Sequence, residues 1–211
     1  MNTRTPERST PRRTSRIAVV GLAAIVAVIG FIGHQVLQSP SSPAPSPLEI
    51  LRGEQRGAPG EADGVIPDGV TVSVFDDQVP AVANLDPDLL DAVRRAASDA
   101  AESGVEFHVN SGWRSAHFQQ QLLQDAVSDY GSEEEAARWV ATAQTSAHVS
   151  GDAIDIGPVD ATSWLAQHGA RYGLCQIYGN ESWHYELRSA AIEQGCPEMY
   201  PDPTHDPRMW Q

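Results

Sequence analysis

Two short segments bring together the residue types that can hold a catalytic metal ion. The first, SAHVSGDAID, spans residues 146–155 and contains His148 and Asp155; the second, ESWH, spans residues 181–184 and ends at His184. A catalytic zinc site needs three imidazole or carboxylate ligands and one open position. Two histidines and an aspartate meet that need. The sequence therefore predicts a site for one Zn²⁺ per chain, formed by His148, Asp155 and His184.

Glu181 lies three residues before His184 and is predicted to share the site without binding the metal. Zinc lowers the pKa of a bound water toward about 7, and a nearby carboxylate can accept the proton that this water loses. Any single histidine is more often structural than a ligand. The combination of three ligands with a base nevertheless favours metal-assisted hydrolysis.

The motifs SxHxxGxAxD and ExWH, with SGWRS at residues 111–115, resemble the zinc D-alanyl-D-alanine carboxypeptidase family, which includes VanY-like carboxypeptidases and VanX-like dipeptidases. The resemblance covers roughly residues 89–187, and such paired motifs are hard to obtain by chance. It implies that His148, Asp155 and His184 bind zinc and that Glu181 is the general base.

The resemblance also implies a substrate site. Arg114 would polarise the scissile carbonyl and hold the substrate, and Gln119 and Ser146 would line the site; a surface ion pair is the alternative for Arg114. The family commonly has tyrosine in place of Trp113 and often an aromatic residue in place of Ala116. The preference for the terminal residue of the substrate therefore stays open, and Trp113 is assigned either to the substrate site or to the core.

Helices and short strands must position these residues. A helix is predicted after Asp86, which suits an N-cap, with Pro87 at the first helical position and Gly104 as the stop. Further helices are predicted at residues 117–130, 132–143 and 161–168, and strands at residues 71–75, 105–109, 153–156 and 182–187.

Because these elements show no regular βαβ repeat, they favour an α+β domain. The resemblance implies a small antiparallel sheet flanked by helices, as in the zinc D-Ala-D-Ala peptidases and hedgehog-like domains. On a strand at residues 182–187, Trp183 would point away from Glu181 and His184 and pack behind them.

The N-terminus predicts a membrane anchor. Five of the 14 basic residues, all arginine, lie within residues 1–16 and precede 17 uncharged residues, Ile17–Gly33. About 20 helical residues cross a hydrocarbon core of roughly 30 Å. Residues 17–37 are therefore predicted to span the membrane, with residues 1–16 in the cytoplasm and the remainder outside. A cleaved signal peptide is the alternative, although the apolar run is long for one and no A-x-A-like site follows.

Residues 38–69 begin with SPSSPAPSP and are predicted as a Pro/Gly-rich linker to a domain at residues 70–211. After Arg16, nine basic and 27 acidic residues remain, a net charge of −18, so no nucleic-acid partner is expected. In such an acidic body, a substrate carboxylate needs a local cation, which favours the substrate role of Arg114. Cys175 and Cys196 are predicted to form a disulfide worth about 3 kcal/mol; two buried thiols are the alternative.

These features together predict a monomeric, membrane-anchored, extracytoplasmic zinc peptidase that releases the C-terminal D-amino acid, D-Ala, from peptidoglycan stem peptides. An L,D-carboxypeptidase, a D,D-dipeptidase or a wall endopeptidase could use the same residues. A non-catalytic zinc-binding or wall-binding module is the alternative from another class of protein. The presence of Glu181 favours the enzyme.

Overall fold

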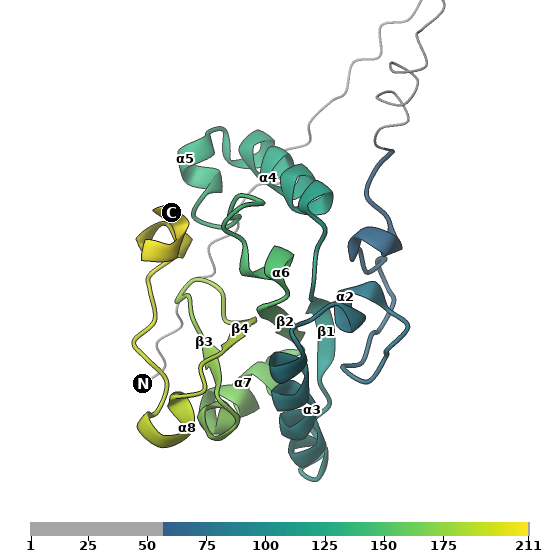
Figure 1. Ribbon diagram of the computed structural model, residues 1–211, viewed down its shortest axis with the longest axis vertical. Helices are drawn as coiled ribbons and strands as arrows, with labels where there is room; N and C mark the ends of the chain where they lie inside the picture. Colours follow the sequence, from purple (N-terminus) through teal and green to yellow (C-terminus); the bar gives the residue numbers. More distant parts are fainter. Residues whose placement is uncertain (1–56, 211) are drawn as a thin grey trace, which may run out of the picture. The chain divides into compact units, whose positions relative to one another are not determined.

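A computed structural model describes residues 57–210 (Figure 1). Residues 1–56, which hold the predicted cytoplasmic segment, the membrane anchor and most of the linker, lie outside the described residues, as does Gln211. Within residues 57–210, no helix combines the length and the apolar character needed to cross a membrane. The elements in chain order are η1 (Glu61–Asp63), α2 (Pro80–Ala83), α3 (Pro87–Ala101), β1 (His108–Ser111), α4 (Ala116–Tyr130), α5 (Glu133–Ala136), α6 (Ala147–Ser150), β2 (Ala153–Gly157), α7 (Val159–His168), η2 (Gly169–Tyr172), β3 (Leu174–Gln176), β4 (His184–Leu187), α8 (Ala191–Gln194), η3 (Pro203–His205) and η4 (Pro207–Trp210).

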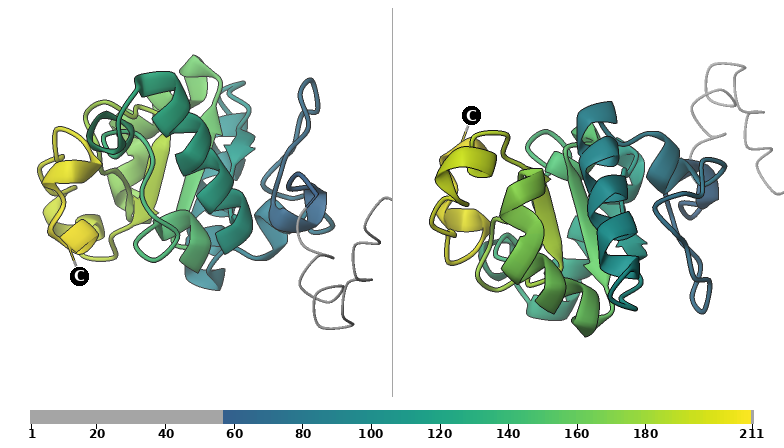
Figure 2. Two further views of the ribbon diagram at one scale, coloured as in Figure 1. Left: turned by 90° about the horizontal axis from the view of Figure 1, so that it is seen from above. Right: turned by 90° about the horizontal axis from the view of Figure 1, so that it is seen from below.

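Residues 57–210 contain a four-stranded antiparallel sheet with the strand order β1-β2-β4-β3. Seen from above in Figure 2, α4 lies over this sheet, and seen from below, α3 and α7 lie over it. The predicted α+β class, with a small antiparallel sheet flanked by helices, is thereby confirmed.

Helix α3 begins where the sequence predicts. The Asp86 side chain accepts hydrogen bonds from the backbone N–H groups of Asp88 and Leu89, and Pro87 occupies the first helical position. These contacts satisfy backbone donors that the first turn would otherwise leave unpaired. The buried face of α3 consists of Leu89, Ala92, Val93, Ala96, Ala97 and Ala100.

The main hydrophobic core lies between the sheet and the helices α3 and α7. Ile154 and Ile156 of β2 and Tyr185 of β4 are buried there, together with Trp164 of α7. Because side chains alternate along a strand, the residues between them, Asp155 on β2 and its neighbours on β4, face the other side of the sheet. That side is the one covered by α4.

Two predicted elements are absent or much shorter in the structure, and the strands predicted at residues 105–109 and 182–187 form at His108–Ser111 and His184–Leu187. Residues 71–75 form no strand and make only an isolated bridge between Ser73 and His108. A turn begins at Ser73, whose carbonyl oxygen accepts a hydrogen bond from the Asp76 N–H at 3.1 Å, and Val72 and Val74 are buried in the core. The helix predicted from Ser132 ends at Ala136 rather than near residue 143, although the Ser132 hydroxyl caps it as expected.

The end of the predicted linker also differs, because residues 57–69 pack on the domain. The Ser115 hydroxyl donates to Asp63 Oδ1 at 2.7 Å, and Ile66 packs against the core. Gly64 has a φ of +91°, and a Cβ there would lie 2.1 Å from the carbonyl oxygen of Trp113. Glycine in this segment therefore permits a close backbone approach, which composition alone does not distinguish from linker flexibility.

Candidate metal centre and active site

The sheet brings two of the predicted metal ligands together. Asp155 on β2 and His184 on β4 are directly paired in the antiparallel register, and Ser111 on β1 is the partner of Asp155 on its other side. Side chains of residues paired across adjacent strands point to the same face. All three therefore project to the side of the sheet opposite the core.

His148 reaches the same place from the single helical turn α6. This turn ends at Gly151, which has a φ of +84° and returns the chain into β2. A Cβ at Gly151 would lie 2.7 Å from the carbonyl oxygen of Asn84 and would also strain the left-handed backbone. The glycine in the motif thus serves to turn His148 back over Asp155.

The three donor atoms are placed as a tetrahedral metal ion requires. His148 Nε2 lies 3.2 Å from His184 Nδ1, and each of these nitrogens lies 3.3 Å from Asp155 Oδ1. Metal–ligand bonds of roughly 2.0–2.1 Å at tetrahedral angles put donor atoms about 3.3–3.4 Å apart. The site therefore fits a zinc ion without rearrangement of its ligands, and all three ligands are buried.

The other ring nitrogen of each histidine is already engaged. His148 Nδ1 lies 2.8 Å from the carbonyl oxygen of Gly112, and His184 Nε2 lies 3.2 Å from Glu186 Oε1. In the neutral imidazole, each of these nitrogens can donate its proton to that oxygen, which leaves His148 Nε2 and His184 Nδ1 as lone-pair donors for a metal. Both tautomers are thus matched to metal binding.

Burial and charge shift the pKa values of the ligands in different directions. Burial lowers the pKa of His148, and the nearby Arg114 cation lowers it further. Burial also acts to lower the pKa of His184, but hydrogen bonds to Asp155 and Glu186 outweigh it and raise the value to about 9. For Asp155, burial acts upward, and the two histidines overcome it, so its pKa lies well below the usual range.

Glu181 stands beside the donor set without joining it. Its Oε2 lies 3.7 Å from His184 Nδ1, and among the described residues its buried Oε1 has no hydrogen-bond partner. Burial raises the pKa of Glu181 to about 7. A carboxylate with an unsatisfied oxygen and a raised pKa, next to a metal site, has the properties of a general base.

Arg114 lies against the same ligands. Its side chain donates to Ser111 Oγ at 2.8 Å, to Gln119 Oε1 at 3.1 Å and to Asp155 Oδ2 at 2.9 Å. Gln119 is itself fixed by a hydrogen bond to the carbonyl oxygen of Ala141. Burial lowers the pKa of Arg114, while Asp155 and Glu181 oppose that shift. The guanidinium is thus a partly buried, oriented cation and not an exposed surface ion pair.

A cleft of about 330 Å³ opens over these groups. Ser146 and Gln119 line it, as predicted, and so does Trp183, which is 39% exposed. The prediction that Trp183 packs behind the site is wrong, because β4 begins only at His184 and strand alternation does not extend to position 183. The substrate-site assignment of Trp113 is also not supported, since its side chain packs against the hydrophobic core and is not among the residues that line the cleft.

The rest of the cleft wall was not predicted. Tyr130 and Trp139 stack with their ring centroids 6.1 Å apart, and Pro203 and Met209 come from the C-terminal segment. Aromatic residues that are far apart in the sequence show no pattern that predicts a shared cleft wall, because only the fold brings them together. Glu186 was missed as well, although its position two residues after His184 on a strand places both on one face.

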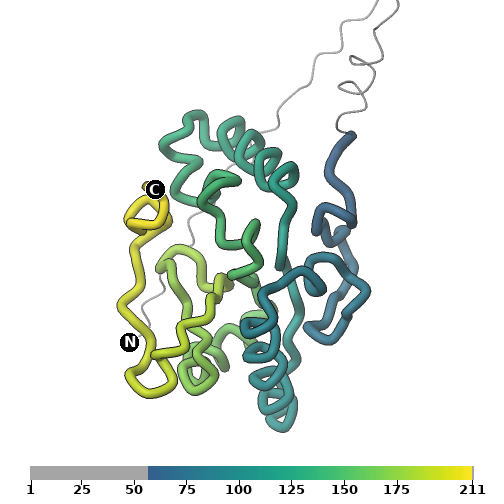
Figure 3. Tube along the Cα trace, in the orientation of Figure 1, coloured from purple at the N-terminus to yellow at the C-terminus, as the bar shows by residue number. Residues whose placement is uncertain are grey.

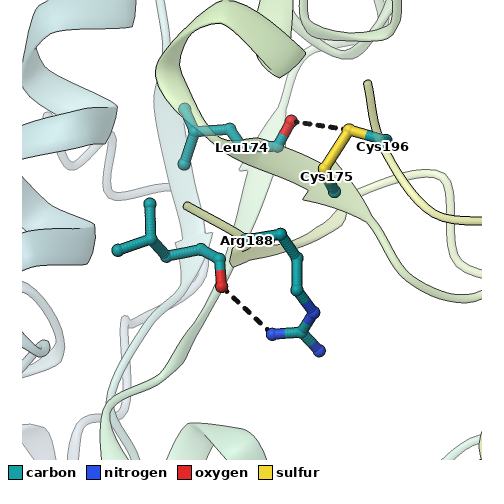
Figure 4. The surroundings of a disulfide bond; sticks show 5 residues. Leu174, Cys175, Arg188 and Cys196 are labelled. Atoms are coloured by element: carbon teal, nitrogen blue, oxygen red, sulfur yellow. Dashed lines mark hydrogen bonds between the residues drawn. A yellow bond between two sulfur atoms is a disulfide. The ribbon is translucent and has the colours of Figure 1, made fainter. Parts of the chain in front are cut away.

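The disulfide between Cys175 and Cys196 is present, which confirms that prediction (Figure 4). It joins β3 to the chain after α8, and the sulfur of Cys196 also lies 3.6 Å from the carbonyl oxygen of Leu174. Glu181 and His184 lie in the loop that this bond closes, so the bond restrains the segment that supplies both side chains.

Fold and site together define an α+β domain with a cluster of residues that could hold one metal ion and an adjoining buried carboxylate. A family model described as VanY, D-alanyl-D-alanine carboxypeptidase, matches residues 82–189, about half of the chain. The chain belongs to this family, which confirms the family identified from the motifs.

Individual proteins are similar to this chain over part of its length. The D-alanyl-D-alanine carboxypeptidase of Enterococcus faecalis is 31% identical over 144 residues, covering 54% of this chain and 51% of that protein, so the chain spans about half the length of that relative. The structure of VanYB in complex with D-alanine-D-alanine is 23% identical with a TM-score of 0.50, covering 62% of this chain and 83% of that chain, and it supports the fold. A Zn(II) complex of a mutant of the vancomycin-resistance D,D-pentapeptidase VanY is 26% identical with a TM-score of 0.48, covering 53% and 75%.

Proposed function

We propose that this protein is a zinc-dependent carboxypeptidase that removes the C-terminal D-amino acid, D-Ala, from peptidoglycan stem peptides. One observation carries the proposal: three buried donor atoms stand 3.2–3.3 Å apart, with the unpaired carboxylate oxygen of Glu181 beside them. Membership of the VanY family supports the substrate class. His148, Asp155 and His184 would hold the metal.

When bound, zinc supplies Lewis acidity, which polarises a carbonyl and lowers the pKa of water. Glu181 accepts the proton of the attacking water and passes it to the nitrogen of the leaving D-amino acid. Burial suits this residue to the task, because it gives the carboxylate a higher proton affinity than an exposed glutamate has. Only 6% of the Glu181 surface is exposed, so the surrounding protein shields its carboxylate from bulk water.

Arg114 supplies the positive charge that the substrate needs. A guanidinium has five N–H groups, and three of its nitrogens each make one hydrogen bond within the described residues, to Ser111, Gln119 and Asp155. Two N–H groups therefore remain for the substrate. We assign them to the terminal carboxylate or to the oxyanion that develops on the scissile carbonyl.

The cleft wall suits a peptide that continues beyond the scissile bond. Trp183 and the stacked pair Tyr130 and Trp139 offer flat apolar surfaces, and Ser146 and Gln119 offer polar atoms near the metal ligands. Clefts of a few hundred Å³ with a few convergent polar groups are typical of small-ligand sites. This wall would contact the part of the stem that precedes the released residue.

We also propose that the domain works outside the cell, tethered to the membrane by residues 17–37. The uncharged run Ile17–Gly33, the arginines before it and the disulfide support this location. The test is protease treatment of intact spheroplasts: the domain should be digested and residues 1–16 protected. Release of a shortened chain into the medium would instead indicate a cleaved signal peptide.

The catalytic proposal is tested with defined tetrapeptide and pentapeptide stems, with and without a chelator, and with products identified by mass. Loss of one D-Ala from the pentapeptide, abolished by the chelator and restored by Zn²⁺, is expected. Cleavage of the tetrapeptide alone would identify an L,D-carboxypeptidase, and release of a dipeptide or internal cleavage would identify a dipeptidase or an endopeptidase. Metal binding without any product would indicate a non-catalytic module.

A further inference from the structure

Glu186 is a fully buried acid next to the metal site. It lies on β4 two residues after His184, has an exposed fraction of 0%, and accepts a hydrogen bond at Oε1 from His184 Nε2 at 3.2 Å. A buried carboxylate is costly unless opposite charges and hydrogen bonds satisfy it. Two arginines, Arg188 and Arg208, meet that requirement here.

The two arginines bind Glu186 differently. Arg188 reaches only Oε2, at 2.6 Å. Arg208 donates from one nitrogen to Oε2 at 2.7 Å and from the other to Oε1 at 3.1 Å. Arg208 thus grips both oxygens in the bidentate manner that fixes a carboxylate in one orientation, and it shares Oε1 with His184.

Arg208 comes from the C-terminal segment, residues 197–210, which lies beyond the residues that the family model matches. Figure 3 shows this segment in yellow, running back beside β3 toward α5. The disulfide at Cys196 precedes it, and Tyr200 N–H donates to the carbonyl oxygen of Ile177 at 2.9 Å. These links bring the segment back to the sheet.

A second buried acid holds Arg208 in place. Asp206, also fully buried, accepts from Arg208 Nε at 2.9 Å and from the Tyr178 hydroxyl at 2.9 Å. The Tyr178 ring in turn lies 5.2 Å from the His184 ring, centroid to centroid. Within the described residues, hydrogen bonds therefore connect Asp206 to Arg208, Arg208 to Glu186 and Glu186 to His184 without a break, and each of these residues is buried or half-buried.

We propose that Arg208 is a positioning residue for the metal centre: it fixes Glu186, which orients the His184 ring and keeps its proton on Nε2. The C-terminal segment thereby sets the affinity of the site for zinc. This inference rests on the proposed metal site. It adds to that site a residue that contacts neither the metal nor the substrate.

The test compares three arginine-to-methionine variants of the 211-residue chain in detergent micelles. Arg208→Met removes the bidentate grip, Arg188→Met removes a single contact to Oε2, and Arg95→Met removes an exposed ion pair on α3 as a matched control. Zn²⁺ affinity is measured by competition with a chelating dye, and Co²⁺ absorption reports the ligand geometry.

Arg208→Met is expected to weaken Zn²⁺ binding about 10–100-fold and to change the Co²⁺ spectrum. Arg188→Met should have a smaller effect and Arg95→Met none. Because Arg208→Met leaves a buried charge short of a partner, Glu186→Gln is measured beside it. This variant keeps the acceptor shape without the charge, and it should weaken Zn²⁺ binding about tenfold while the far-ultraviolet circular dichroism stays unchanged.

Wild-type affinity and an unchanged Co²⁺ spectrum in folded Arg208→Met and Glu186→Gln would overturn the inference. So would an equal loss in Arg208→Met and Arg95→Met, because that result would indicate general destabilisation. A wild-type chain that binds neither ion would overturn the proposed function itself, and the inference with it. Tight Zn²⁺ binding by the wild type together with unaffected variants would refute only the role of Arg208.

Discussion

Glu181→Gln removes the proposed base and keeps the shape of the side chain. Because the Glu181 carboxylate lies 3.7 Å from His184 Nδ1 and is not one of the three clustered donors, the variant should still bind one zinc ion per chain. General-base catalysis typically contributes about 10²–10⁴ in rate, or roughly 3–5 kcal/mol of barrier. We therefore expect kcat on stem peptides to fall at least about a hundredfold.

The same substitution should stabilise the metal-free protein. Burial raises the pKa of Glu181 from 4.5 to about 7, so the folded chain disfavours the ionised carboxylate. An acid whose pKa is higher in the folded state lowers stability as the pH rises above its unfolded pKa, and the loss is complete above about pH 7. At about 1.4 kcal/mol for each pKa unit, the cost is about 3.5 kcal/mol. Glutamine carries no charge and should recover up to about that amount at pH 8.

Three measurements on one preparation check this reasoning. They are the rate of D-Ala release, the zinc content after dialysis, and urea unfolding in chelator at pH 5 and pH 8. A near-normal kcat would show that Glu181 is not the base, and loss of zinc would show that it acts as a ligand. A metal-free variant that is less stable than the wild type at pH 8 would refute the burial argument.

Further outcomes follow from the same site. His148→Ala should lose both zinc and turnover, and metal analysis showing a full zinc complement would contradict the ligand assignment. In the metal-free chain the pKa of His184 is raised to about 9, so zinc must displace a proton from this residue below that pH. The affinity for zinc should therefore rise up to about tenfold per pH unit from pH 7 to 9, and calorimetry should detect the release of on the order of one proton. Reduction of the bond between Cys175 and Cys196 should cost about 3 kcal/mol of stability, read as a lower Tm, and an unchanged Tm would argue against it. Trp183→Ala should raise KM for stem peptides several-fold with little change in kcat, whereas an unaltered KM would remove Trp183 from the substrate wall.

The parts of the fold that follow local rules could be predicted from the sequence. The Asp86 cap, Pro87 and a regular apolar face predict helix α3, because these signals involve residues within one or two turns of one another. The donor set was also predictable, because His148 and Asp155 lie in one motif whose glycine turn brings them together. A metal site whose ligands all lie in two short segments can be recognised from the sequence.

The remainder depends on contacts between distant residues. Residues 71–75 alternate like a strand, yet the core and not a neighbouring strand accounts for the pattern. Trp183 lies one position outside β4, where a shift of a single residue decides between core and cleft. The link between Arg208 and Glu186 spans 22 residues and joins two charged side chains that sequence rules assign to the surface.

The position of the disulfide before the C-terminal segment also links it to the proposed metal site. Cys196 directly precedes the C-terminal segment that carries Arg208, so the disulfide and the proposed metal site depend on the same part of the chain. Two events that act on the same folded element are linked in a thermodynamic cycle. The factor by which the disulfide raises the affinity for zinc must equal the factor by which bound zinc raises the equilibrium constant for forming the disulfide. A zinc-loaded chain would therefore keep its disulfide at reductant concentrations that open the metal-free chain.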